Sequence, residues 1–152
     1  MIQTINMVKL TLSILFVLCN LYAIAQTYKI DCVNSTTQSE MNLCAKAAYL
    51  KSDSTLNINY QKILSALDNN IQIVSKPKPL DTAQITYCET LKANIIVAQK
   101  VWAQFRDVNA NAEKYIYNNG SMSPMIYFQS LEYQTKLRID YLKKLYKDLF
   151  ED

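Results

Sequence analysis

Hydrophobic residues in the middle of the chain recur with the period of an α-helix. Steps of four and three residues separate them, and such steps place side chains on one face of a helix with 3.6 residues per turn. The residues are Leu56, Tyr60, Ile63 and Leu67. The spacing predicts an amphipathic helix from about residue 53 to residue 68.

A shorter helix over residues 38–48 is predicted just before it. Its start is marked by Thr37 and Glu40, which match a capping box, where the two side chains satisfy each other's free backbone amides. After the amphipathic helix the composition changes over residues 69–82, which contain a Lys-Pro-Lys-Pro run. Proline cannot continue a helix and restricts the residue before it, so we expect an exposed loop there.

A third helix is predicted from residue 83 or residue 90 to Tyr117. Its apolar positions again follow the helical period: Leu91, Ile95, Ala98, Trp102 and Phe105. Asn118-Asn119-Gly120 ends it, because these residue types tolerate the left-handed conformation that a helix C-terminus commonly adopts.

The last predicted helix begins with Ser123 as N-cap and Pro124 at the first helical position, and runs to about Phe150. The face predicted for it comprises Leu131, Thr135, Arg138, Leu142, Leu145 and Leu149. No stretch alternates with period two for long enough to indicate a sheet. The pattern therefore predicts an all-α fold, a small antiparallel bundle of three to four helices.

The N-terminal 25 residues have the pattern of a secretory signal peptide. Lys9 precedes an apolar run from Leu10 to Cys19, and Ala23-Ile24-Ala25 supplies the small-x-small cleavage pattern. The run is short for a membrane span, which needs about 20 residues. We expect cleavage, a mature domain over residues 26–152 and no membrane span thereafter. An uncleaved anchor is the alternative, and it places the domain in the same oxidising compartment.

Composition narrows the possible functions. The chain has 16 basic and 13 acidic side chains, a balance that gives no electrostatic case for binding nucleic acid. It has no histidine, the commonest acid/base catalyst and metal ligand, and its one glycine cannot build a phosphate-binding loop. Catalytic triads, zinc sites and nucleotide chemistry are excluded on these grounds, and no cofactor is expected.

Three cysteines remain in the mature chain. Cys32 and Cys44 flank the first capped helix, and in an exported protein a disulfide between them is the simplest interpretation, worth roughly 3 kcal/mol. A redox role would require a Cys-x-x-Cys spacing, which is absent. Cys88 is left over, and it is either buried and inert, linked to another chain in a dimer, or reactive.

Two arginines are candidates for a structural role. Arg106 lies between Gln99 and Glu113 in a series spaced by seven residues, which indicates a rim with charged heads in water. Arg138 lies in the middle of its predicted face, where a guanidinium needs a partner. We therefore hypothesise that Arg138 closes a buried cluster with Asp53, Asp107 or Glu40.

Tyrosines gather around the turn between the third and fourth helices: Tyr115, Tyr117, Tyr127 and Tyr133. Tyrosine supplies a large contact area at low entropic cost and is favoured at binding surfaces. The cluster predicts either a recognition tip or a chance gathering in a tyrosine-rich chain.

Three sequence phrases resemble the LprI-like family of exported bacterial proteins, a lysozyme-inhibitor type. They follow the two cysteines in order and comprise Asp53, Leu56 and Tyr60, then Gln99, Trp102, Arg106 and Asp107, then Thr135, Arg138 and Leu142. The resemblance implies a small α-helical domain without catalytic residues. Many members have a second cysteine pair, whose places fall here near Ala110 and Ser130.

Together these features predict a non-enzymatic, protein-binding domain of the periplasm or the secreted fraction. Inhibition of a lysozyme-type muramidase is its most concrete form, with a tip tyrosine or Lys114 reaching the catalytic carboxylates of the enzyme. The alternative is a structural or assembly module of the bacterial envelope with no enzyme target.

Overall fold

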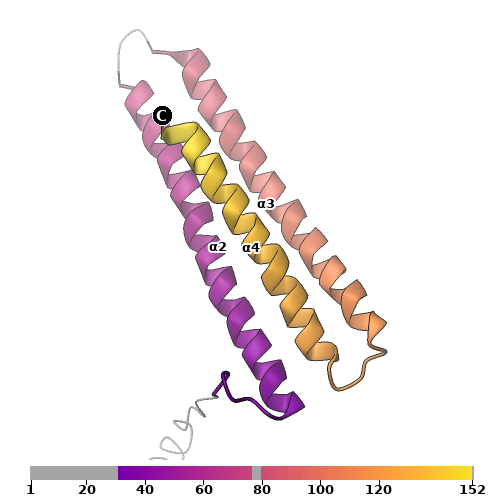
Figure 1. The fold of residues 1–152 in the computed structure, drawn as a ribbon. Helices are drawn as coiled ribbons and strands as arrows, with labels where there is room; N and C mark the ends of the chain where they lie inside the picture. Colours follow the sequence, from indigo (N-terminus) through magenta and orange to yellow (C-terminus); the bar gives the residue numbers. More distant parts are fainter. Residues whose placement is uncertain (1–30, 77–79, 152) are drawn as a thin grey trace, which may run out of the picture. The chain divides into compact units, whose positions relative to one another are not determined.

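A computed structural model describes residues 31–76 and 80–151. They form three long helices, α2 (Gln38–Val74), α3 (Thr82–Ile116) and α4 (Ser123–Phe150), and no strand occurs among them. Successive helices run in opposite directions, and α4 contacts both of the others (Figure 1). The all-α bundle is confirmed, with three helices. The predicted signal peptide lies outside the described residues.

Helix α2 is one continuous helix where the hydrophobic pattern predicted two. No break separates residues 38–48 from 53–68, because the intervening Tyr49 to Ser52 includes no helix-breaking residue and Ser52 is itself buried. The predicted loop over 69–82 is also wrong in its first part. Helix α2 continues through Asn69 and Asn70 to Val74, where the Ser75 amide and hydroxyl both donate to the Ile71 carbonyl.

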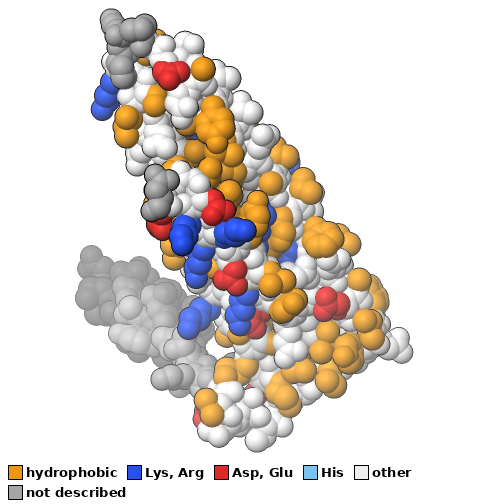
Figure 2. Space-filling view, turned by 45° about the horizontal axis from the view of Figure 1, so that its top comes forward, with side chains coloured by type: hydrophobic (Ala, Val, Ile, Leu, Met, Phe, Trp, Pro, Cys, Tyr) orange, Lys and Arg blue, Asp and Glu red, His pale blue; other side chains and the backbone are white. Residues whose placement is uncertain are grey.

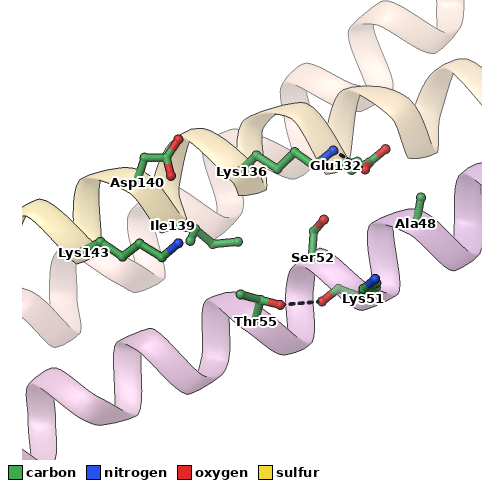
Figure 3. Close-up of a pocket in the computed structure, with 9 residues that line it drawn as sticks. All are labelled: Ala48, Lys51, Ser52, Thr55, Glu132, Lys136, Ile139, Asp140 and Lys143. Carbon is green, nitrogen blue, oxygen red and sulfur yellow. Dashed lines mark hydrogen bonds and ion pairs between the residues drawn. The ribbon is translucent and has the colours of Figure 1, made fainter.

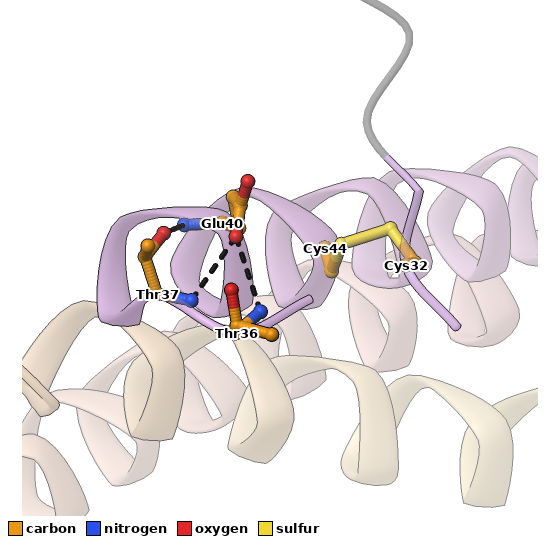
Figure 4. The surroundings of a disulfide bond; sticks show 5 residues. All are labelled: Cys32, Thr36, Thr37, Glu40 and Cys44. Atoms are coloured by element: carbon orange, nitrogen blue, oxygen red, sulfur yellow. Dashed lines mark hydrogen bonds between the residues drawn. A yellow bond between two sulfur atoms is a disulfide. The ribbon is translucent and has the colours of Figure 1, made fainter. Parts of the chain in front are cut away.

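The first turn of α2 contains the predicted capping box (Figure 4). The Thr37 hydroxyl accepts from the Glu40 amide at 3.2 Å, and the Glu40 carboxylate accepts from the amides of Thr37 and Thr36 at 3.0 and 3.1 Å. These hydrogen bonds, that of the Thr37 amide foremost, lower the pKa of Glu40. The Cys32–Cys44 disulfide is present and ties the segment before the helix to its second turn.

Helix α3 begins at the earlier of its two expected starts, with Asp81 as N-cap accepting from the Gln84 amide at 3.0 Å. Its buried face differs from the prediction, because Phe105 is 60% exposed and Ala98 is also exposed. The residues of α3 that are buried are Cys88, Ile95, Arg106 and Ala110. Continuing the helical period from Ile95 by four, three and four residues leads to Arg106 and not to Phe105.

The turn between α3 and α4 is held by backbone hydrogen bonds and by the side chains of Ser123 and Asn42. Asn118 and Asn119 adopt φ angles of 50° and 55°, the left-handed region that asparagine tolerates. Gly120 does not have a positive φ, but an added Cβ would lie 3.3 Å from the Tyr117 carbonyl oxygen. The prediction that Ser123 is the N-cap of α4 is wrong. Met122 is the N-cap, and the Ser123 hydroxyl donates to the Lys114 carbonyl.

The hydrophobic core occupies the half of the bundle that contains the α2 C-terminus. Its buried members come from all three helices and are Leu56, Ile63, Leu67, Ile95, Ile139 and Leu142. The predicted face of α2 is confirmed, with Tyr60 packed against this core. On α4, Leu131, Thr135 and Leu142 are buried as predicted, while Ile139 takes the central place expected for Arg138. Within the described residues, no helix is long and apolar enough to cross a membrane.

Candidate functional site

Arg106 lies where the three helices meet and contacts all of them. Its Nη1 donates to the Asp53 carboxylate of α2 at 2.9 Å and to the Thr135 hydroxyl of α4 at 3.4 Å, and its Nε donates to the adjacent Asp107 at 2.9 Å. The side chain of Arg106 is only 10% exposed. We call these four residues the Arg106 cluster. The rim position expected for Arg106 is therefore wrong.

Aromatic rings enclose the guanidinium of Arg106. Its Cζ lies 5.4 Å from the ring centre of Tyr49 and 5.1 Å from that of Trp102, within the range of cation–π attraction. Burial by itself lowers the pKa of Arg106, but the hydrogen bonds that it donates to Asp107 and Asp53 and the charge interaction with Tyr49 outweigh this effect, so the pKa is raised. Arg106 is thus a permanent cation with its donors satisfied.

Arg138 has a different role from the one hypothesised. It forms no salt bridge with an acidic side chain among the described residues; its Nε donates to the Gln99 side-chain oxygen at 3.0 Å. Its guanidinium lies 5.6 Å from the ring centre of Trp102 and 4.9 Å from that of Tyr141. Burial lowers the pKa of Arg138. Arg106, not Arg138, closes the cluster with Asp53 and Asp107.

The three sequence phrases therefore converge on one junction. Their polar members form the Arg106 cluster and the Arg138–Gln99 pair around Trp102, while Leu56, Tyr60 and Leu142 belong to the adjoining core. The set joins the three helices, and of its members Asp53 also lines a shallow groove on α2. Its arrangement is that of a structural clasp between helices rather than a reactive centre.

The remaining thiol and the places of the absent second cysteine pair are all buried. Cys88 is 2% exposed, and the Gln84 side-chain nitrogen lies 3.9 Å from its sulfur. That burial favours the inert alternative over a reactive thiol or a thiol-linked dimer. Ala110 and Ser130, near which the resemblance would place a second cysteine pair, are 0% and 5% exposed, so both places are buried.

The predicted recognition tip comprises the four tyrosines around the α3–α4 turn together with Lys114. Tyr115, Tyr117 and Tyr133 are 64%, 45% and 65% exposed. Tyr127 is half-buried and makes an edge contact with Phe128. The Lys114 ammonium lies 5.8 Å from the ring centres of both Tyr115 and Tyr127, so the tip has a cation next to two aromatic rings.

A shallow groove of about 310 Å³ opens beside the tip. It lies between the end of α3 and the start of α4, and its lining includes Tyr117 and Tyr133. The other lining residues are Glu113, Ile116, Ile126, Gln129 and Ser130. The groove combines exposed rings with one carboxylate, the composition of a protein-contact surface.

A larger groove, of about 580 Å³, lies between α2 and α4 and was not predicted from the sequence (Figure 3). Its charged residues are Lys51, Glu132, Lys136, Asp140 and Lys143. Lys136 pairs with Glu132 at 2.6 Å, so the charges in the groove partly neutralise one another. Only the pairing of α2 with α4, which are not neighbours in sequence, brings these residues together. No cluster of metal-ligating side chains occurs within the described part of the chain.

Over residues 31–76 and 80–151, the fold and the junction around Arg106 define a small, disulfide-tied bundle of three helices that polar residues join. A family model described as "Lysozyme inhibitor LprI" matches residues 32–142. The chain therefore belongs to the LprI family.

One similar protein is an uncharacterized protein, R02472, of Rhizobium meliloti (strain 1021). It is 29% identical over 131 residues, which cover 86% of this chain and 89% of that protein. No solved structure matches the chain.

Proposed function

We propose that this protein is an exported, non-enzymatic inhibitor of a lysozyme-type muramidase, and that it binds the enzyme through its tip. The observation that carries the proposal is the gathering of exposed tyrosines and Lys114 at one end of the bundle. The family supplies the class of target, since its description is that of a lysozyme inhibitor.

The tip is held in place before any partner binds. The Ser123 hydroxyl and the Tyr117 amide both donate to the Lys114 carbonyl, at 2.9 and 3.3 Å. The Asn42 side chain of α2 donates to the Ser121 carbonyl at 3.1 Å, which fixes the turn against the first helix. A surface ordered in advance loses less entropy on binding, and this favours affinity.

The chemistry of the tip suits the cleft of a glycosidase. Such clefts contain two carboxyl groups flanking the bond to be cleaved. The Lys114 ammonium supplies a cation for one of them, and the neighbouring rings of Tyr115 and Tyr117 supply flat surfaces for the sugar-binding subsites. Occupying the cleft excludes the substrate without any chemical step.

The carboxylates of the larger groove do not resemble a hydrolytic pair. Glu132 and Asp140 lie on α4 with two helical turns between them, a rise of about 12 Å along the axis. Glycosidases hold their two carboxyl groups about 5 to 9.5 Å apart. This separation supports an inhibitor rather than a muramidase. The Cys32–Cys44 disulfide supports export, because disulfides persist in oxidising compartments.

A turbidity assay with bacterial cell walls and a panel of lysozymes tests the proposal. The protein is expected to slow clearing by at least one of them at micromolar concentration. Tyr117→Ala together with Tyr133→Ala should weaken inhibition at least tenfold with unchanged helicity, because both rings line the tip groove.

Tyr87→Ala is the matched control, since Tyr87 is 56% exposed near the opposite end of α3. It should inhibit as the wild type does. If every lysozyme of the panel stays fully active, the proposal is wrong. Equal inhibition by the control and the tip variant would remove the tip as the binding surface.

A further inference from the structure

The outer face of α3 carries an apolar stripe that no other described helix covers. Its members are Val97, Val101, Phe105 and Val108, which are 57–67% exposed. Steps of four, four and three residues put them on one side of the helix, away from the buried face that contains Ile95 and Arg106. Trp102 separates the stripe from the core.

Helix α4 extends this surface across the seam with α3. Tyr141 contacts Arg138, whose guanidinium also bonds Gln99 of α3, so the Tyr141 ring lies at the seam. Tyr141 is 52% exposed, and Leu137, one turn before it, is 53% exposed. Hydrophobic side chains extend along the α3 side of the molecule, whereas Lys and Arg gather toward α2 and α4 (Figure 2).

The exposed area is large enough for a stable dimer. With about 200 Å² for an aromatic side chain and about 100 Å² for an aliphatic one, the six side chains present roughly 450 Å². A standard interface covers about 800 Å² per partner, of which a little over half is apolar. An apolar patch of this size on a small protein marks an interaction surface.

An antiparallel crossing of two α3 helices about a two-fold axis places valines of the stripe opposite small apolar residues. About a centre between Gln104 and Phe105, Val101 corresponds to Val108, and Val97 corresponds to the exposed Ala112. An isologous interface needs a self-complementary patch, in which residue i of one copy meets residue j of the other and j meets i. The two valine pairings meet this need, and Phe105 faces Gln104 beside the axis.

The flanking charges fit the same two-fold arrangement. About that centre Lys100 corresponds to Asn109, and Glu113 corresponds to Ile96. No two like charges are thereby placed opposite each other along α3, an arrangement that would otherwise oppose association.

From these observations we infer that a second copy of this chain covers the α3 stripe. In the dimer the two α3 helices cross in opposite directions with Phe105 near the two-fold axis, and Leu137 and Tyr141 of each copy complete the contact. Cys88 takes no part, because it is buried on the other side of α3. The inference is independent of the proposed inhibition.

Sedimentation equilibrium of the protein with its Cys32–Cys44 disulfide intact tests the inference. The wild type is expected to have twice the chain mass at about 100 µM, since interfaces of standard size have dissociation constants from the micromolar range downward. Phe105→Lys should be monomeric at the same concentration, with unchanged helicity and melting temperature. Ile58→Lys, at an equally exposed apolar residue of α2, should stay dimeric.

Oxidative cross-linking gives a second readout, because a disulfide traps the associated state covalently. Phe105→Cys should form a disulfide-linked dimer on mild oxidation because of its place at the two-fold axis, while Ile58→Cys should not. A monomeric wild type at 100 µM, or a Phe105→Lys variant as dimeric as the wild type, would overturn the inference. Loss of the dimer with inhibition retained would leave the proposed function untouched.

Discussion

One guanidinium, that of Arg106, reaches side chains of both other helices while remaining almost out of contact with water. Arg106→Met keeps much of the side-chain volume but leaves the Asp53 carboxylate without its cation. Because Asp53 is itself 31% exposed, solvent compensates in part, and we expect a loss of about 2 kcal/mol in the free energy of unfolding. Urea denaturation at neutral pH measures it.

Arg138→Met is the matched control, since Arg138 has one hydrogen bond to Gln99 and a similar set of aromatic neighbours. It should cost less than about 1 kcal/mol, the value of one ordinary hydrogen bond. Equal losses for the two variants would contradict the assignment of the clasp to Arg106.

Cys88 offers a direct probe of the core. With 2% of its surface exposed, its thiol should react with a thiol reagent only when the protein opens, so labelling in buffer should be at least a hundredfold slower than in urea. Colorimetric thiol titration follows both rates. Labelling of the native protein at the rate of the unfolded chain would show that the thiol is accessible, contrary to the structure.

Which arginine is buried could not be settled from the sequence. The pattern placed Arg106 at the edge of its apolar series and Arg138 in the middle of its own, and a shift of one residue in the predicted stripe of α3, from Phe105 to Arg106, changes the assignment. The helical spacing alone favours Phe105 over Arg106 as the buried residue, because Phe105 is hydrophobic. The polar partners that make burial of Arg106 tolerable, Asp53 and Thr135, come from two other helices and become visible only in the fold.

The continuity of α2 is testable with proline. Leu50 lies between the two helices that the pattern predicted, is 52% exposed and falls inside the single observed helix. Leu50→Pro should destabilise the protein by about 3 kcal/mol, because proline removes a backbone hydrogen bond and clashes with the preceding turn. Leu50→Ala should be nearly neutral in thermal unfolding followed by circular dichroism. Tolerance of proline at this place would indicate a break in α2.

The capping box of α2 gives the protein a pH-dependent contribution. Hydrogen bonds from Thr37 and Thr36 hold the pKa of Glu40 below its ordinary range in the folded state, so protonation favours unfolding. The contribution is present at neutral pH and is lost as the pH falls below about 4. Glu40→Ala should therefore unfold at lower urea than the wild type at neutral pH and at similar urea in strong acid. A difference that persists in acid would contradict this origin.

At the scale of elements the sequence predicted helix type well and helix ends less well. Thr37 and the asparagines of the α3–α4 turn affect the backbone of residues next to them in the chain, so the helix ends that they form could be predicted from the sequence. The extension of α2 through Asn69 and Asn70 could not be predicted from the sequence, because tertiary packing stabilises helical residues whose own helix propensity is poor. The prolines of the connection lie outside the described residues.

Across the whole molecule, different surfaces have different chemistry. The α2–α4 groove is charged, the outer face of α3 is apolar, and the tip combines rings with one cation. The tyrosines of the tip were found from the sequence because they are close along the chain. The α2–α4 groove was not predicted from the sequence, because its residues come from two helices that are separated in the chain by the whole of α3.

Hydrogen–deuterium exchange on the complex with an inhibited lysozyme tests the central claim most directly. The claim predicts that protection appears at the end of α3 and the start of α4, over residues 113–133, and that residues 48–55 and 136–143 of the α2–α4 groove are unchanged. Protection confined to residues 48–55 and 136–143 of that groove, or no change anywhere, would contradict it.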